Sequence, residues 1–117
     1  MVDSAKPGAS LYPNRVIADV ISLVAQEKNV PRRLLTHRSR CRTQAVQARH
    51  LAMYLSYVVL GRILAEIGEE FGRDRTTVSY ACAHIEDMRD DPAFDAEVCR
   101  LEGWLETAGQ ETQNVAA

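Results

Sequence analysis

Lysine is scarce in this 117-residue chain, and so are aromatic residues, cysteines and long hydrophobic runs. Only seven residues are aromatic, and no stretch alternates valine, isoleucine or threonine with polar residues, which argues against a β-sheet. The longest apolar-rich stretch, residues 51–60, is too short to span a bilayer. The first ten residues lack the charged start and apolar core of a signal peptide, so we expect no association with a membrane.

The cysteines exclude a disulfide framework. There are three, Cys41, Cys82 and Cys99, an odd number at wide spacing without a Cys-x-x-Cys motif, which predicts reduced thiols in a cytoplasmic protein. No histidine pairs with a cysteine at ligand spacing, so we expect neither a metal site nor a cofactor. No Ser/His/Asp, Cys/His or paired-carboxylate pattern rises above background, so we expect no enzymatic activity.

Acidic residues are missing from one third of the chain. None occurs in residues 28–65, whereas residues 86–111 hold nine acids against two arginines. A basic stretch in a chain of net charge −2 predicts a nucleic-acid footprint. The alternative is a solvated face whose partner charges lie on neighbouring elements. The basic residues of the stretch are Lys28, Arg32, Arg33, Arg38, Arg40, Arg42, Arg49 and Arg62.

Apolar residues recur at helical spacing along most of the chain, which predicts an all-α fold in one compact domain over residues 14–108. We expect a flexible leader over 1–13 and a disordered tail over 109–117. The expected helices span about 15–28, 31–35, 43–59, 63–71, 75–88 and 92–107. The expected core residues of the first and third are Val16, Ile17, Val20, Ile21 and Val24, and Val46, Leu51, Tyr54, Leu55 and Val58.

The fourth and fifth expected helices are joined by a short turn at Gly72, the outline of a helix-turn-helix. Asp74 is a good N-cap for the fifth helix, because its carboxylate can accept from the free N–H groups of the first turn. One face of that helix is apolar, carrying Val78, Ala81, Cys82, Ile85 and Met88. The other carries Arg75, Thr76, Ser79 and Tyr80, with Thr77 at the margin, a pattern typical of contacts with phosphates and base edges. Helix pairs with a glycine turn also occur in plain bundles.

Three segments together resemble the DNA-binding C-terminal domain of DnaA, the bacterial replication initiator. Residues 73–78, Arg-Asp-Arg-Thr-Thr-Val, with Ala81-Cys82 and Ile85-Glu86 after them, are similar to the family's Gly-Gly-Arg-Asp-His-Thr-Thr-Val motif and its continuation. Residues 48–55, Ala-Arg-His-Leu-Ala-Met-Tyr-Leu, resemble its Ala/Pro-Arg-Gln-Ile-Ala-Met-Tyr-Leu helix. Residues 64–68 resemble its Leu-Pro/Ala-Glu-Ile-Gly segment. The resemblance implies a Trp-repressor-like helical bundle that binds DNA.

Two departures concern the turn and the helix start. The chain has one glycine where the family has two, and Arg75 replaces the family's histidine. We expect Arg75 to contact either a guanine or a phosphate. The initiator's ATPase would need a Gly-rich loop ending in Gly-Lys-Ser/Thr, and neither Lys6 nor Lys28 has that setting.

The resemblance also implies a basic loop that enters the minor groove, for which Arg40 and Arg42 are the candidates, with Arg38 left open. It implies a phosphate contact through Arg49, the alternative being a solvated helix charge. Tyr54 and Tyr57 can be interpreted as stacking platforms for single strands, although core packing fits their apolar helix better. The predicted DNA-binding residues are Arg40, Arg42, Arg49, Arg73, Asp74, Arg75, Thr76, Thr77, Ser79 and Tyr80.

These patterns predict a protein that binds double-stranded DNA in a sequence-dependent way, associated with the nucleoid and acting in transcription or replication. DnaA-box-like sites are the expected targets. The alternative is a protein-interaction module that keeps the fold without reading DNA, with the acidic final helix available to a partner.

Overall fold

The computed structural model describes residues 16–36 and 43–116, and every regular element within them is an α-helix. The all-α prediction is confirmed. Side chains are described for residues 16–36 and 44–107. The predicted leader, residues 1–13, lies outside the described residues. The helices are α1 (Ile17–Lys28), α2 (Arg32–Thr36), α3 (Thr43–Val58), α4 (Leu64–Phe71), α5 (Arg75–Met88) and α6 (Pro92–Ala116).

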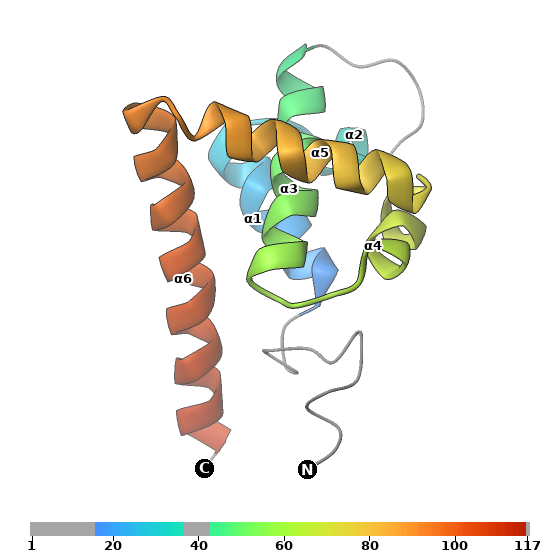
Figure 1. Cartoon of the computed structure of the whole chain (residues 1–117). Coiled ribbons are helices and arrows are strands. Elements are labelled where there is room, and N and C mark those ends of the chain that lie inside the picture. Colours follow the sequence, from blue (N-terminus) through green and yellow to red (C-terminus); the bar gives the residue numbers. More distant parts are fainter. Residues whose placement is uncertain (1–15, 37–42, 117) are drawn as a thin grey trace.

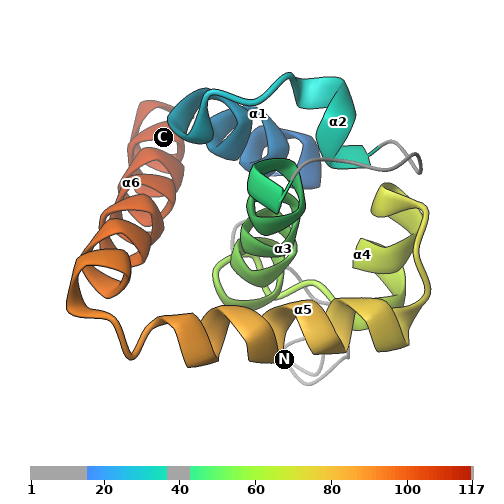
Figure 2. The same cartoon turned by 90° about the horizontal axis from the view of Figure 1, so that it is seen from above.

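Helix α3 is the centre of the fold, and the other helices surround it (Figure 2). Residues 51–56 are all buried, so this helix has no solvent-facing side in its middle, as expected for a helix covered on every face. The one hydroxyl among them, on Ser56, donates to the carbonyl of Ala52 at 2.9 Å. Of its predicted core, Leu51, Tyr54 and Leu55 are buried, whereas Val46 and Val58 are half-buried.

Helix α1 begins at Ile17, and its N-cap residue, Val16, makes no side-chain capping hydrogen bond. The carboxylate of Asp19 instead accepts from the N–H of Val16 at 3.2 Å. The prediction that Val16 is buried is wrong, because this residue precedes the helix in an extended conformation and is 48% exposed. The other four predicted core residues, Ile17, Val20, Ile21 and Val24, are buried.

Helix α6 leaves the end of α5 at a turn and runs beside α1 (Figures 1 and 2). It continues to Ala116, so the prediction of a helix end near Thr107 is wrong. The tail predicted from residue 109 stays a prediction. Gly109 costs an isolated helix only about 1 kcal/mol, and no proline follows Pro92 to end it. Pro92 itself occupies the first helical position, where its missing N–H is not needed.

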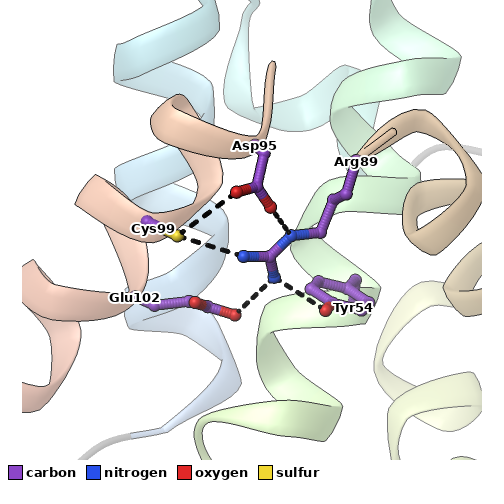
Figure 3. A network of polar contacts seen from close by, with 5 residues as sticks. All are labelled: Tyr54, Arg89, Asp95, Cys99 and Glu102. Carbon is purple, nitrogen blue, oxygen red and sulfur yellow. Dashed lines mark hydrogen bonds and ion pairs between the residues drawn. The ribbon is translucent and has the colours of Figure 1, made fainter. Parts of the chain in front are cut away.

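Arg89, the C-cap of α5, joins three helices (Figure 3). Its Nε atom donates to Asp95 at 2.5 Å, its Nη1 atom to Tyr54 and Glu102 at 2.9 and 3.0 Å, and its Nη2 atom to the Cys99 sulfur at 3.1 Å. Burial opposes the charge of Arg89, but the hydrogen bonds to Asp95, Tyr54 and Glu102, together with the Glu102 charge, outweigh it and raise the pKa of the guanidinium. The network fixes α6 against α3 and α5.

Two ion pairs join α6 to α1. Lys28 meets Glu97 at 2.7 Å, and Arg100 meets Glu27 at 3.1 Å. Together with the Arg89 network, they engage three carboxylates of the acidic final helix, Asp95, Glu97 and Glu102, within the chain.

Candidate nucleic-acid interface

Two glycines set the turn between α4 and α5. Gly72 ends α4 in the left-handed conformation, φ 66° and ψ 34°, and its N–H donates to the carbonyl of Glu69 at 3.3 Å. The next N–H, of Arg73, donates to the carbonyl of Gly68 at 2.8 Å, which closes the helix end. A Cβ on Gly68 would lie 2.4 Å from the carbonyl oxygen of Arg73. Both glycines are therefore required for α5 to leave the turn in this direction.

Asp74 is the N-cap of α5, as predicted. Its carboxylate accepts from the backbone N–H of Thr77 at 3.0 Å. Hydrogen bonds from the backbone and side chain of Thr77 lower the pKa of Asp74, so the carboxylate is charged at neutral pH. A negative charge therefore already occupies the helix N-terminus.

The two faces of α5 are separated as the sequence predicts. Val78, Ala81 and Ile85 are buried, and Cys82 and Met88 pack partly against the core. Burial raises the pKa of Cys82 to about 11, consistent with an unreactive packing residue. The predicted DNA-binding residues of α5 lie on the other side, where Arg75, Thr76, Ser79 and Tyr80 are exposed and Thr77 is half-exposed.

Arg73 lies in the turn and is half-buried. Its Nη1 atom donates to the carbonyls of Phe71 and Gly72 at 3.3 and 3.4 Å. This side chain therefore holds the end of α4.

Arg49 is placed differently from the expected phosphate contact. Its side chain is only 6% exposed, and its Nε and Nη2 atoms donate to the carbonyls of Leu35 and Leu34, each at 2.9 Å. The last carbonyls of a helix lack partners within the helix, and a cation there also meets the negative end of the helix dipole. The structure therefore gives Arg49 the role of joining α2 to α3. A phosphate contact would require it to leave these carbonyls.

Several basic residues of the stretch 28–65 make contacts within the protein, which the composition alone does not reveal. Lys28 pairs with Glu97 of α6, and Arg62 pairs with Glu66 at 3.2 Å. Arg32 donates to Ser22 and to the carbonyl of Ala18. For Lys28 and Arg62 the alternative interpretation holds, because their partner charges lie on neighbouring elements. The candidate minor-groove residues, Arg40 and Arg42, and also Arg38, lie outside the described residues.

Sequence reasoning missed a cluster of three rings beside the exposed face of α5. The Nδ1 atoms of His50, on α3, and His84, on α5, lie 2.9 Å apart, a hydrogen-bonding distance. The ring of Tyr80 stacks on His84 with an interplanar angle of 12°, and His50 meets both rings edge-on. Burial lowers the pKa of His50 to about 4, and the charges of His84 and Arg49 act in the same direction. The spacing of Tyr80 and His84 is visible in the sequence, but the approach of His50 is not.

The two tyrosines of α3 differ in burial. Tyr54 is buried and its hydroxyl accepts from Arg89, in agreement with core packing. Tyr57 is 44% exposed, so core packing is wrong for this residue. Among the described residues no three side chains gather as a metal site, and no helix in that part of the chain is long and apolar enough to cross a membrane.

A short helix, a three-residue turn and a second helix with an exposed polar face define a helix-turn-helix protein. Comparison with known families agrees, since residues 17–85 match the model of the bacterial DnaA protein helix-turn-helix. The chain belongs to that family.

Two curated relatives are chromosomal replication initiator proteins DnaA. The protein from Mesorhizobium japonicum is 47% identical over 78 residues, which are 65% of this chain and 16% of the relative. The protein from Symbiobacterium thermophilum is 42% identical over 80 residues, 67% of this chain and 17% of the relative. The chain thus spans about a sixth of the length of either relative.

Proposed function

We propose that the protein binds double-stranded DNA with sequence preference, through the helix-turn-helix formed by α4 and α5. One observation carries the proposal: the start of α5 leaves Arg75, Thr76, Ser79 and Tyr80 exposed while its opposite face is buried. An arginine and short hydroxyl side chains at the exposed start of a helix suit base edges in a major groove. Membership of the DnaA helix-turn-helix family supports the same ligand.

Within this interface the side chains divide into two kinds. Arg75 and Thr77 suit base contacts, because an arginine can bind guanine bidentately and a threonine methyl can pack on thymine. Arg73, Thr76 and Ser79 suit contacts with phosphate, which fix position and carry no sequence information. Arg40 and Arg42 remain the proposed minor-groove residues. The target is a site related to the DnaA box, altered where Arg75 and the shorter turn face the bases.

The biological role that follows is a regulator of transcription or replication that occupies initiator sites without hydrolysing ATP. The two relatives are replication initiators, and a helix-turn-helix of the same family can compete with an initiator for the same DNA. Such a role places the protein on the chromosome, in the cytoplasm.

The protein-interaction module remains the second candidate, and exposed Trp104, on α6, favours it. The engagement of Asp95, Glu97 and Glu102 within the chain weakens its original argument, an acidic helix free for a basic partner.

Selection of bound sequences from a random duplex pool, followed by anisotropy titration, tests the proposal. The wild type should enrich a consensus and bind it at least tenfold more tightly than a scrambled duplex. Replacement of Thr76 and Tyr80 together by Ala should weaken binding at least tenfold. Replacement of Gln26, exposed on α1, is the matched control and should have no effect. No enrichment, with no duplex binding at low salt, would leave the interaction module as the function.

A further inference from the structure

The His50–His84 pair lies next to the proposed DNA interface, through Tyr80. The Tyr80 side chain is 65% exposed, and its ring stacks on His84 with the centroids 6.1 Å apart. His84 lies eight residues beyond Thr76 on α5, which is about 12 Å along a helix axis. Tyr80 thus links the pair to the exposed face of α5 that carries Thr76, so the pair borders the proposed DNA interface.

The short distance between the two Nδ1 atoms restricts the protons of the pair. At 2.9 Å one ring must donate an N–H and the other must accept it, since two N–H groups cannot face each other. In the neutral pair, the ring that donates through Nδ1 carries a bare Nε2, and the ring that accepts carries an Nε2–H. The neutral pair thus presents one donor and one acceptor, and only the donor suits a phosphate oxygen.

One added proton changes this. Burial and the neighbouring charges hold the pKa of His50 low, so its ring is the acceptor of the Nδ1 hydrogen bond in the protonated pair. Both Nε2 atoms then carry hydrogen, and the pair has one positive charge. The charged or titratable groups near it are Arg49 on α3, and Tyr80 and Asp87 one turn to either side of His84 on α5.

We propose that the His50–His84 pair binds a backbone phosphate of DNA and takes up one proton when it does so. This inference rests on the proposed DNA binding. A phosphate beside the pair favours the protonated form and so raises the pKa of the pair in the complex. The added affinity is then fully present below the pKa of the free pair and is lost as the pH rises through the pKa of the complex. DNA should bind more tightly at pH 6 than at pH 8.

The experiment is a series of anisotropy titrations of the full chain with the selected duplex, from pH 5.5 to 8.0 at constant ionic strength. For the wild type we expect the dissociation constant to rise five- to tenfold between pH 6 and pH 8. Calorimetry in two buffers of different ionisation enthalpy should show uptake of up to one proton on binding. Helix content by circular dichroism at each pH separates unfolding from weaker binding.

Three glutamine variants identify the histidine that causes the pH dependence of DNA affinity. His84→Gln should bind with a dissociation constant that changes less than twofold over the range. His50→Gln should keep the pH response, because an amide oxygen can still accept from the Nδ1–H of His84. His37→Gln, at the third histidine, is the matched control and should behave as the wild type.

A wild-type affinity that does not change with pH, or a response that persists in His84→Gln or vanishes in His37→Gln, would overturn the inference and leave DNA binding intact. Absence of duplex binding at every pH would instead contradict the proposed function itself.

Discussion

The guanidinium of Arg49, within α3, donates to the carbonyl of Leu35, near the end of α2, with Nε and oxygen 2.9 Å apart. A second bond from the same side chain reaches the carbonyl of Leu34. The position that resembles a phosphate-binding residue of the DnaA family therefore stabilises the protein's own backbone. The two carbonyls belong to buried or half-buried residues, so water cannot fully replace these hydrogen bonds when they are lost.

Replacement of Arg49 should consequently affect the stability of the protein more than its affinity for DNA. We expect Arg49→Ala to lower the free energy of unfolding by about 2–4 kcal/mol, since it leaves two backbone acceptors without a charged donor. Urea unfolding measures this. Arg49→Lys retains the charge but not the two-pronged geometry and should recover only part of the loss. A variant as stable as the wild type, with DNA affinity reduced on all sequences, would restore the phosphate contact.

Gly68 and Gly72 should be intolerant of alanine for different reasons. Gly68→Ala should destabilise by about 1–3 kcal/mol, because the new Cβ would meet the Arg73 carbonyl oxygen at 2.4 Å. Gly72→Ala should cost about 1–2 kcal/mol through its left-handed conformation. Gly103→Ala in α6 is the control, with nothing within 4 Å of its Cβ, and should stabilise by about 0.5–1 kcal/mol. Thermal unfolding of the three variants checks the order, and equal effects would show that the turn is less constrained than it looks.

DNA binding should depend on salt less steeply than the basic stretch indicates. Lys28 and Arg62 are paired with acids and Arg49 is buried, so about four positive charges, on Arg73, Arg75, Arg40 and Arg42, remain to neutralise phosphates. The logarithm of the association constant should fall with the logarithm of salt concentration with a slope of about −3.6. Anisotropy between 50 and 300 mM salt measures the slope. A slope near zero would contradict electrostatic binding to the backbone.

Arg75 should decide one position of the DNA site. It is exposed at the first position of α5, and bidentate binding of a guanine discriminates by about 1–3 kcal/mol. Arg75→His should therefore shift the selected consensus at one or two positions while leaving stability unchanged. Recovery of the same consensus by both proteins would assign Arg75 to a phosphate.

Loss of Arg89 should release α6 from the rest of the molecule. We expect Arg89→Ala to cost about 2–3 kcal/mol and to speed amide hydrogen exchange in α6 more than in α3, because four partners from two helices lose their donor. Tyr54→Phe removes only one of these contacts and should cost about 1 kcal/mol. Uniform exchange changes across all helices would show that the network serves the whole core rather than α6.

The sequence by itself determined the helices, the capping of α5 by Asp74 and the division of that helix into two faces. These features depend on residues three or four positions apart, which lie close together in any helix. Gly72 likewise marks the turn, because few other residues adopt its conformation at low cost.

Contacts between distant segments were decided only by the tertiary structure. The bond from Arg49 to α2, the pairing of Lys28 with Glu97 and the meeting of His50 with His84 join residues 14, 69 and 34 positions apart. Such pairs depend on how helices pack around α3, and no local pattern encodes them. For the same reason the charge of a basic stretch did not predict which of its residues are free, since the neutralising acids come from other helices.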